Sequence, residues 1–292
     1  MTTRKTSKSV PPHPLDSLLR TERIPHIWCP GCGIGTVFNA VLIAIKNTGL
    51  DPNSIAMVSG IGCTGRMAGY IKIDSFHTTH GRALPFATGL KLAQPQTKVI
   101  VVSGDGDLFA IGGNHFIHSA RRNMDITVIC VNNLNYGMTG GQQAPSTPFG
   151  GKTTTSVNGS PEEPFNFCYL ASSCGATYVA RWTAMQVRSL RSSITEALQK
   201  TGFSFVEVIT PCPSSYGRRN RMGSALEMLK FYHGRSVIRS DIDPKDASMD
   251  IDKEIVVGKF VDIERPTFLD NYALVNRLKI PQWRSMYTEK AR

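Results

Sequence analysis

The sequence has no long apolar run. Hydrophobic residues make up 41% of the 292 positions, yet none of the apolar stretches approaches the roughly 20 residues that a membrane-spanning helix needs. The first residues, MTTRKTSKSVPPHPLDSLL, lack the continuous apolar segment of a secretory signal. We therefore predict a soluble, cytoplasmic protein that does not enter a membrane.

Acidic residues are few compared with basic ones. The chain has 33 Lys and Arg against 22 Asp and Glu, which gives a formal net charge of +11. A basic surface can bind nucleic acid, but the positive residues are scattered, with one local cluster at Arg218, Arg219 and Arg221. An acidic protein partner or an anionic cofactor explains the charge as well, and we expect no nucleic-acid partner.

Strand-like and helix-like patterns alternate between residues 36 and 212. Apolar and β-branched runs predict buried strands at 54–60, 98–104, 125–133 and 203–212. Helix-like segments lie at 36–49, 81–95, 108–123 and 183–200. This order favours an α/β fold with a doubly wound parallel sheet. Such sheets bind ligands at the carboxyl ends of their strands.

Three regions are expected along the chain. Residues 1–24 form a polar N-terminal arm with a short helix, and residues 25–222 contain the sheet. Residues 223–292 form a C-terminal extension in which we see no second core, and we expect it to contact a partner subunit. The segment 136–166 is rich in Gly, Pro, Ser and Thr, so it should be a long loop that is functional or mobile.

The chain contains seven cysteines, an odd number. In a reducing compartment, thiols serve as ligands or core residues more often than they form disulfides. Four of them lie beside Gly or Pro in predicted turns: Cys29, Cys32, Cys63 and Cys212. The other three, Cys130, Cys168 and Cys174, are expected in the core. Four thiolates can hold Zn²⁺ or an iron–sulfur cluster, and Cys29 with Cys32 could be a redox pair. The spacing alone leaves these alternatives open.

Polar residues follow two of the predicted strands. The segment SGDGDLFAIGG (103–113) follows one strand and opens a predicted helix, and NNLNYG follows the next strand. Asp105 and Asn133 should therefore lie at the tips of neighbouring strands. A carboxylate, an amide oxygen and a backbone carbonyl can supply half of a Mg²⁺ coordination shell, which diphosphate oxygens and water can complete.

This arrangement resembles the diphosphate-binding motif of thiamine diphosphate enzymes. The resemblance implies that Asp105, Asn133 and the carbonyl of Asn135 bind Mg²⁺, and that Gly104 and Gly106 pack against the diphosphate. The remaining residues that we assign to the cofactor site are Gly62, His80, Asp107, Gly137, Met138 and Thr139.

Six motifs occur in a fixed order, namely CPGCG, GIGC, HTTHGRALPFATGLKLAQP, SGDGD, NNLNYGMTGGQ and TPCP. Together they resemble the β subunit of 2-oxoacid:ferredoxin oxidoreductases over about residues 24–220. The resemblance implies one [4Fe–4S] cluster close to thiamine diphosphate, ligated by Cys29, Cys32, Cys63 and Cys212. It implies oxidative decarboxylation of a 2-oxoacid, with transfer of the acyl group to coenzyme A and of the electrons to ferredoxin.

The resemblance also suggests catalytic residues. Arg66 is a candidate for binding a substrate carboxylate, which favours 2-oxoglutarate over pyruvate and other 2-oxoacids. His80 could bond the diphosphate or a reacting oxygen, and Thr139 could face the substrate. Because we find no second α/β domain to supply the carboxylate that acts on the aminopyrimidine, we expect an α subunit and an (αβ)₂ assembly.

Two other functions stay open at this point. One is a non-redox thiamine diphosphate decarboxylase or synthase whose four cysteines bind zinc. The other is a basic nucleic-acid-binding protein with a structural four-cysteine site.

Overall fold

The computed structural model describes residues 13–240, 242–247, 249 and 251–277. All the site residues predicted above fall within these ranges. Half of the predicted N-terminal arm, residues 1–12, and the end of the C-terminal extension, residues 278–292, lie outside them.

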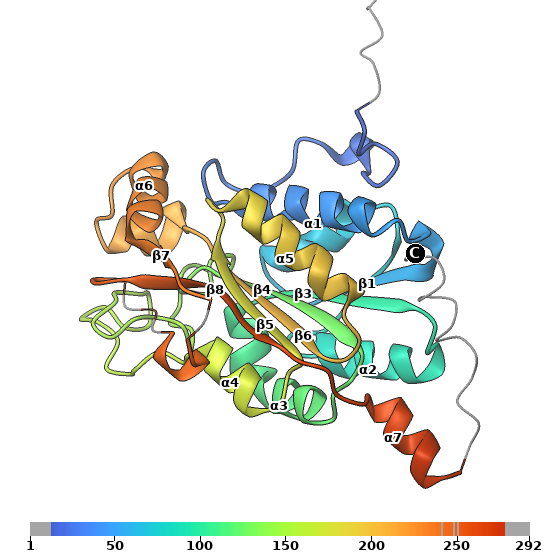
Figure 1. Ribbon diagram of the computed structural model, residues 1–292. Coiled ribbons are helices and arrows are strands. Elements are labelled where there is room, and N and C mark those ends of the chain that lie inside the picture. Colours follow the sequence, from blue (N-terminus) through green and yellow to red (C-terminus); the bar gives the residue numbers. More distant parts are fainter. Residues whose placement is uncertain (1–12, 241, 248, 250, 278–292) are drawn as a thin grey trace, which may run out of the picture.

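The described residues form one eight-stranded sheet, in the order β2-β1-β3-β4-β6-β5-β8-β7 (Figure 1). All neighbouring strands are parallel except β5 and β8, which are antiparallel. The predicted α/β fold with a doubly wound parallel sheet is thus confirmed. The strands are β1 (Ile55–Ser59), β2 (Asp74–His77), β3 (Lys98–Gly104), β4 (Ile126–Asn132), β5 (Tyr178–Thr183), β6 (Ser204–Ile209), β7 (Ser236–Ile238) and β8 (Ile255–Asp262).

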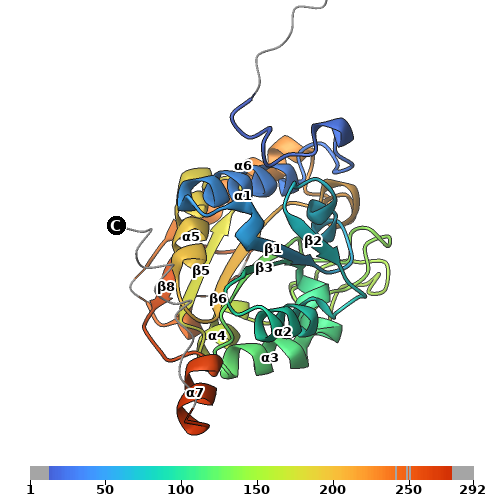
Figure 2. The same cartoon turned by 90° about the vertical axis from the view of Figure 1, so that its right-hand side faces the viewer.

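Helices cover both faces of the sheet, as Figure 2 shows. Helices α1 (Ile34–Thr48) and α5 (Val187–Gln199) lie on one face. Helices α2 (Ala83–Ala93), α3 (Gly113–Arg121) and α4 (Phe167–Ser173) lie on the other. Helix α1 ends at Gly49, whose φ of 68° suits the left-handed position at a helix terminus.

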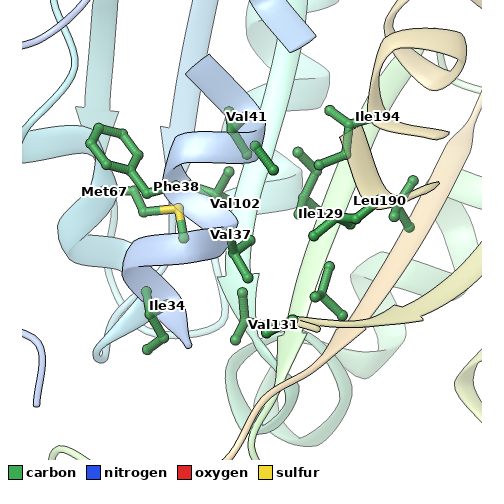
Figure 3. Packing of buried hydrophobic residues seen from close by; sticks show 14 of the residues in the cluster. Ile34, Val37, Phe38, Val41, Met67, Val102, Ile129, Val131, Leu190 and Ile194 are labelled. Atoms are coloured by element: carbon green, nitrogen blue, oxygen red, sulfur yellow. The ribbon is translucent and has the colours of Figure 1, made fainter. Parts of the chain in front are cut away.

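The core between α1, α5 and the sheet follows from the alternation of side chains along each strand. In β3, Ile100 and Val102 face α1 and α5, whereas Val99 and Val101 face the other helical layer. Strands buried on both faces read as continuous apolar runs, which is why β3 and β4 were recognisable in the sequence. Figure 3 shows the packing of Ile34, Val37, Phe38, Val41, Met67, Val102, Ile129, Val131, Leu190 and Ile194.

The predicted helix at 183–200 begins later than its sequence indicated. Residues Tyr178–Thr183 form β5, and α5 starts only at Val187. Arg181 interrupts the apolar pattern of β5, but its guanidinium is fully buried and bonded to Glu207 of β6. The predicted helix at 108–123 is also interrupted, because a π-helical turn at Asp107–Ile111, which is wider than an α-helical turn, precedes α3.

The C-terminal extension contributes to the same sheet. Helix α6 (Ala225–Arg235) and β7 precede β8, which pairs with β5, and α7 (Phe268–Val275) follows. Met228, Tyr232, Ile255 and Val257 join the core beneath α1 and α5. Contact of this extension with a partner subunit remains a prediction. In the described part of the chain, no helix combines the length and the apolar character needed to cross a membrane.

Candidate cofactor and cluster site

The carboxyl ends of β3, β4 and β6 meet at one edge of the sheet. Gly104 at the end of β3 pairs with Val131, and Asn132 at the end of β4 pairs with Ile209 of β6. The residues that follow these strands therefore emerge side by side. The strand order thus brings the GDGD segment, the NNLNYG segment and the Cys212 segment together, as the predicted parallel sheet required.

Asp105 is a buried carboxylate at this edge, with 3% of its surface exposed. Its Oδ2 accepts a hydrogen bond from Ser146 Oγ. Burial raises the pKa of Asp105 to about 7, although the hydrogen bonds from Ser146 and from the Gly106 backbone oppose this rise. Within the described residues no basic side chain forms an ion pair with Asp105. A divalent cation would stabilise its charged form, so this carboxylate fits the predicted Mg²⁺ ligand.

Asn133 follows β4, the strand that neighbours β3, after which Asp105 comes, and Asn133 is half-buried. Its backbone carbonyl accepts from Asn135 Nδ2 at 2.8 Å, while its side-chain amide has no hydrogen-bond partner among the described residues. The amide oxygen is thus available as a ligand. Asn135 is 2% exposed and follows two residues later. Together these residues supply the oxygen donors that Mg²⁺ prefers.

The two glycines of the GDG motif have different surroundings. A Cβ on Gly104 would meet no atom closer than 3.9 Å, so the site side of this residue is open. A Cβ on Gly106 would overlap the ring of Tyr136. The Tyr136 hydroxyl donates to the Gly106 carbonyl at 3.2 Å. Gly106 is therefore required for packing of the NNLNYG segment, a constraint that the motif alone did not indicate.

Asp107 is fully engaged by protein groups. Its Oδ1 lies 2.5 Å from His80 Nδ1 and accepts from the backbone N–H of Gly81 at 2.9 Å and of Ile61 at 3.1 Å. Its Oδ2 accepts from Ser103 Oγ at 2.6 Å. Because an ionised carboxylate only accepts, His80 Nδ1 donates and the Nε2 atom carries the free lone pair. Asp107 thus orients His80, whose side chain is 37% exposed.

The four cysteines of the predicted cluster line one cavity of about 80 Å³: Cys29, Cys32, Cys63 and Cys212. Asn133, Gly137 and Met138 line the same cavity. Burial raises the pKa of Cys32 and raises the pKa of Cys63 to about 11, and the neighbouring thiols add to both shifts. The raised pKa values mean that neighbouring thiolates repel one another. A cationic group bound between the thiols would remove this repulsion.

The spacing of these thiols bears on which group they would bind. Among the described residues, no three His, Cys, Asp or Glu side chains are close enough to hold a single metal ion. A lone Zn²⁺ requires sulfurs about 2.3 Å from the ion. The four thiols share one cavity, and both zinc and an iron–sulfur cluster are bound by such a set of thiolates. Cys130 and Cys168 lie in the core as predicted, whereas Cys174, at the end of α4, is only partly buried and packs against the core from outside.

Four further predicted residues differ in their contacts. Arg66 is exposed on the short helix Thr64–Gly69 after Cys63, and its side chain forms no bond with the described residues. Met138 is 47% exposed. The Thr139 hydroxyl donates to Gln142 Oε1 at 2.7 Å, so it is committed to its own loop. Gly62 has a φ of 113° and open space on its Cβ side.

Ser146 and Trp28 lie at the site but were not among the residues predicted for it. Ser146 lies in the long loop after β4 and is buried against Asp105. Trp28 Nε1 donates to the Cys63 carbonyl at 2.8 Å and so connects two cysteine segments. The composition of the 136–166 loop indicated function, but nothing in it distinguished Ser146 from its other hydroxyl residues.

Comparisons with known proteins identify the family to which the chain belongs. Residues 60–208 match the family model for the C-terminal TPP binding domain of thiamine pyrophosphate enzymes. The chain is 49% identical to the 2-oxoglutarate synthase subunit KorB of Methanocaldococcus jannaschii, over 91% of this chain and 99% of that one. It is also 49% identical to KorB of Methanothermobacter marburgensis, over 90% and 92% of the two chains.

A solved structure is similar over the whole chain. It is the 2-oxoglutarate:ferredoxin oxidoreductase from Magnetococcus marinus with 2-oxoglutarate, coenzyme A and succinyl-CoA bound. The TM-score is 0.80 at 28% sequence identity, and the match covers 99% of this chain and 100% of that one.

Proposed function

Because the chain belongs to the β subunits of 2-oxoacid:ferredoxin oxidoreductases, of the 2-oxoglutarate type, we propose that it works with an α subunit to convert 2-oxoglutarate and coenzyme A into succinyl-CoA and CO₂. Ferredoxin receives the electrons. The observation that carries this proposal is the shared cavity, in which four cysteines lie against the Asn133–Met138 segment of the cofactor edge.

The diphosphate side of the site would be held by oxygen donors. Asp105 and Asn133 side chains and the Asn135 carbonyl would bind Mg²⁺, and the open side of Gly104 leaves room for a diphosphate. When bound, thiamine diphosphate supplies the electron sink for decarboxylation. The protein holds this group in place and excludes water from the Asp105 side of the edge.

His80 is positioned for proton transfer. Its Nδ1–H is fixed on Asp107, which leaves Nε2 on the exposed side of the ring. A fixed imidazole with one free nitrogen can accept or donate a proton at a reacting oxygen. Arg66 has no protein partner within the described residues, so its guanidinium is available for the distal carboxylate of 2-oxoglutarate.

The four cysteines would hold a [4Fe–4S] cluster as the first electron acceptor. Cys212 Sγ lies 3.8 Å from Asn135 Oδ1, so one proposed cluster ligand contacts the proposed Mg²⁺-binding segment. This contact supports direct electron transfer between the two groups, since tunnelling weakens steeply with distance.

A partner is required for the complete reaction. The described residues form a single sheet domain, so the carboxylate that acts on the aminopyrimidine would come from the α subunit. We further propose an (αβ)₂ assembly that functions in the cytoplasm.

The test is anaerobic co-expression with the α subunit, followed by iron and acid-labile sulfide analysis and an assay of viologen reduction. We expect coenzyme A-dependent reduction with 2-oxoglutarate and weaker reduction with pyruvate or branched-chain 2-oxoacids. Cys212→Ser should reduce iron content, whereas Cys174→Ser, a matched thiol outside the cavity, should not. Zinc without iron, or an iron-replete complex that is inactive with every 2-oxoacid, would overturn the proposal.

A further inference from the structure

A group of basic side chains lies beside the most accessible of the four cavity cysteines. Cys29 is exposed, whereas Cys32 is buried and Cys63 and Cys212 are half-buried. The Cys212 segment continues through the turn Pro213–Gly217 into a loop that leads to α6. This loop carries Arg218, Arg219 and Arg221, and all three side chains are exposed.

The loop is held in place next to Cys29. Ser214, in the turn before it, has its Oγ 3.1 Å from Cys29 Sγ. After the loop, Ala225 at the start of α6 packs so closely against Gly31 that a Cβ on Gly31 would overlap it. Gly31 lies in the turn between Cys29 and Cys32. Both ends of the basic loop are therefore fixed against the segment that contains Cys29.

Lys152 joins the same surface. Asn220, within the loop, accepts from the Lys152 backbone N–H at 2.8 Å and donates to the Lys152 carbonyl at 3.0 Å. The Lys152 side chain is exposed. We call Lys152, Arg218, Arg219 and Arg221 the basic rim.

The basic rim is not neutralised by the protein. Within the described residues none of its four side chains forms an ion pair with Asp or Glu. The acidic residue nearest in sequence, Glu227, accepts from the Ser224 backbone N–H at 2.6 Å and caps α6. Ile27, which lines the cavity and is 55% exposed, adds an apolar surface beside Cys29.

We infer that the basic rim docks an acidic ferredoxin, so that electrons leave the enzyme through the Cys29 side of the cavity. This inference rests on the proposed function, because it requires a cluster in the cavity. A small protein with clustered carboxylates fits an uncompensated basic surface beside an exposed apolar residue, and complementary charge accelerates its association. It also brings the acceptor to the cysteine that is closest to solvent.

The electron balance fits a single-electron carrier. Each 2-oxoglutarate that is converted releases two electrons, and the thiol proton of coenzyme A is released when the new thioester bond forms. The two electrons leave one at a time, and each reduces one ferredoxin cluster. The acceptor must therefore dock and dissociate in every catalytic cycle, which favours a charged, reversible contact over a permanent apolar interface.

The test uses the complete complex with the double variant Arg218→Glu and Arg219→Glu. The matched control is Arg121→Glu with Arg122→Glu, another exposed adjacent pair, at the end of α3 on the opposite helical layer (Figure 1). Three quantities are measured: the KM for ferredoxin, the rate of viologen reduction, and the Kd for oxidised ferredoxin at low and high salt.

We expect the rim variant to raise both the KM and the Kd for ferredoxin about tenfold or more at low salt, with a reduced salt dependence. Viologen reduction by the rim variant should stay within about twofold of the wild-type rate. The control pair should leave the KM for ferredoxin, the Kd for ferredoxin and the viologen rate unchanged. The milder pair Arg218→Gln and Arg219→Gln should raise the KM and the Kd for ferredoxin by an intermediate amount. An effect that follows the change in charge in this way distinguishes lost charge from misfolding.

Other outcomes would overturn the inference. An unchanged ferredoxin Kd in the rim variant would exclude this surface as the docking site. A higher KM for coenzyme A with unchanged ferredoxin binding would assign the basic rim to the anionic acyl acceptor, and tighter binding of an RNA oligonucleotide than of ferredoxin would assign it to nucleic acid. A wild-type complex that fails to reduce viologen would instead contradict the proposed function.

Discussion

Replacing Arg181 with Met tests a buried ion pair that supports the cofactor edge. Arg181 in β5 and Glu207 in β6 are at most 1% exposed, and Nε lies 2.7 Å from Oε2. Arg181 also donates to the Ala247 carbonyl at 2.7 Å. The variant removes the cation and leaves the Glu207 carboxylate buried without compensation, which costs about 3–5 kcal/mol.

The corresponding change in melting temperature can be worked out from the chain length. For 292 residues the entropy of unfolding is about 0.6 kcal/mol per degree, so the loss corresponds to about 5–8 °C. Thermal unfolding of the purified chain, followed by circular dichroism, measures it. The double variant Arg181→Met with Glu207→Leu should be more stable than the sum of the single changes predicts, because no unpaired charge remains. A shift below about 2 °C, or additive effects, would refute this reasoning.

Three further results are expected. Arg66→Met should raise the KM for 2-oxoglutarate about 10- to 100-fold, as the loss of a charge-assisted bond predicts; an equal rise for pyruvate would show that Arg66 does not bind the distal carboxylate. His80→Gln should lower kcat about 10²- to 10⁴-fold with little change in thiamine diphosphate affinity, and a purely structural role would instead weaken cofactor binding. Burial favours a higher pKa for Asp125, but Lys98 and Lys91 outweigh it and hold this pKa below its ordinary value. Its contribution to stability is therefore complete above about pH 4 and lost as the pH falls below that value. Asp125→Asn should be less stable at pH 7, with a smaller fall in melting temperature between pH 5 and 2.

The strands that carry the site could be predicted because their signal is local. β1, β3, β4 and β6 are short segments rich in apolar and β-branched residues, and polar or glycine residues mark where each one ends. The parallel order then requires their carboxyl ends to meet. For this reason Asp105, Asn133 and Cys212 could be brought together from sequence alone.

The remaining strands lack such a signal. In β2, all four residues are exposed, so no apolar pattern marks it. β5 contains a buried Arg181 whose partners Glu207 and Asn166 come from distant segments, so its position in the core depends on tertiary contacts. β8 pairs with β5 from more than 70 residues further along the chain. The hydrogen bond of Ser146 to Asp105 also depends on tertiary contacts, because it forms only when the long loop folds back on the end of β3.

The short segment after β4 sets the distance between the two proposed groups. Asn133 lines the cavity of the four cysteines, and Asn135 Oδ1 lies 3.8 Å from Cys212 Sγ. A Cβ on Gly137 would lie only 3.3 Å from the same sulfur, so a larger residue there would displace the thiol. No side chain fits at Gly106, because the ring of Tyr136 from this segment packs against it. One turn of chain thus contacts both the proposed Mg²⁺-binding edge and a proposed cluster ligand, and a single turn would fix an electron-transfer distance better than two independently positioned loops would.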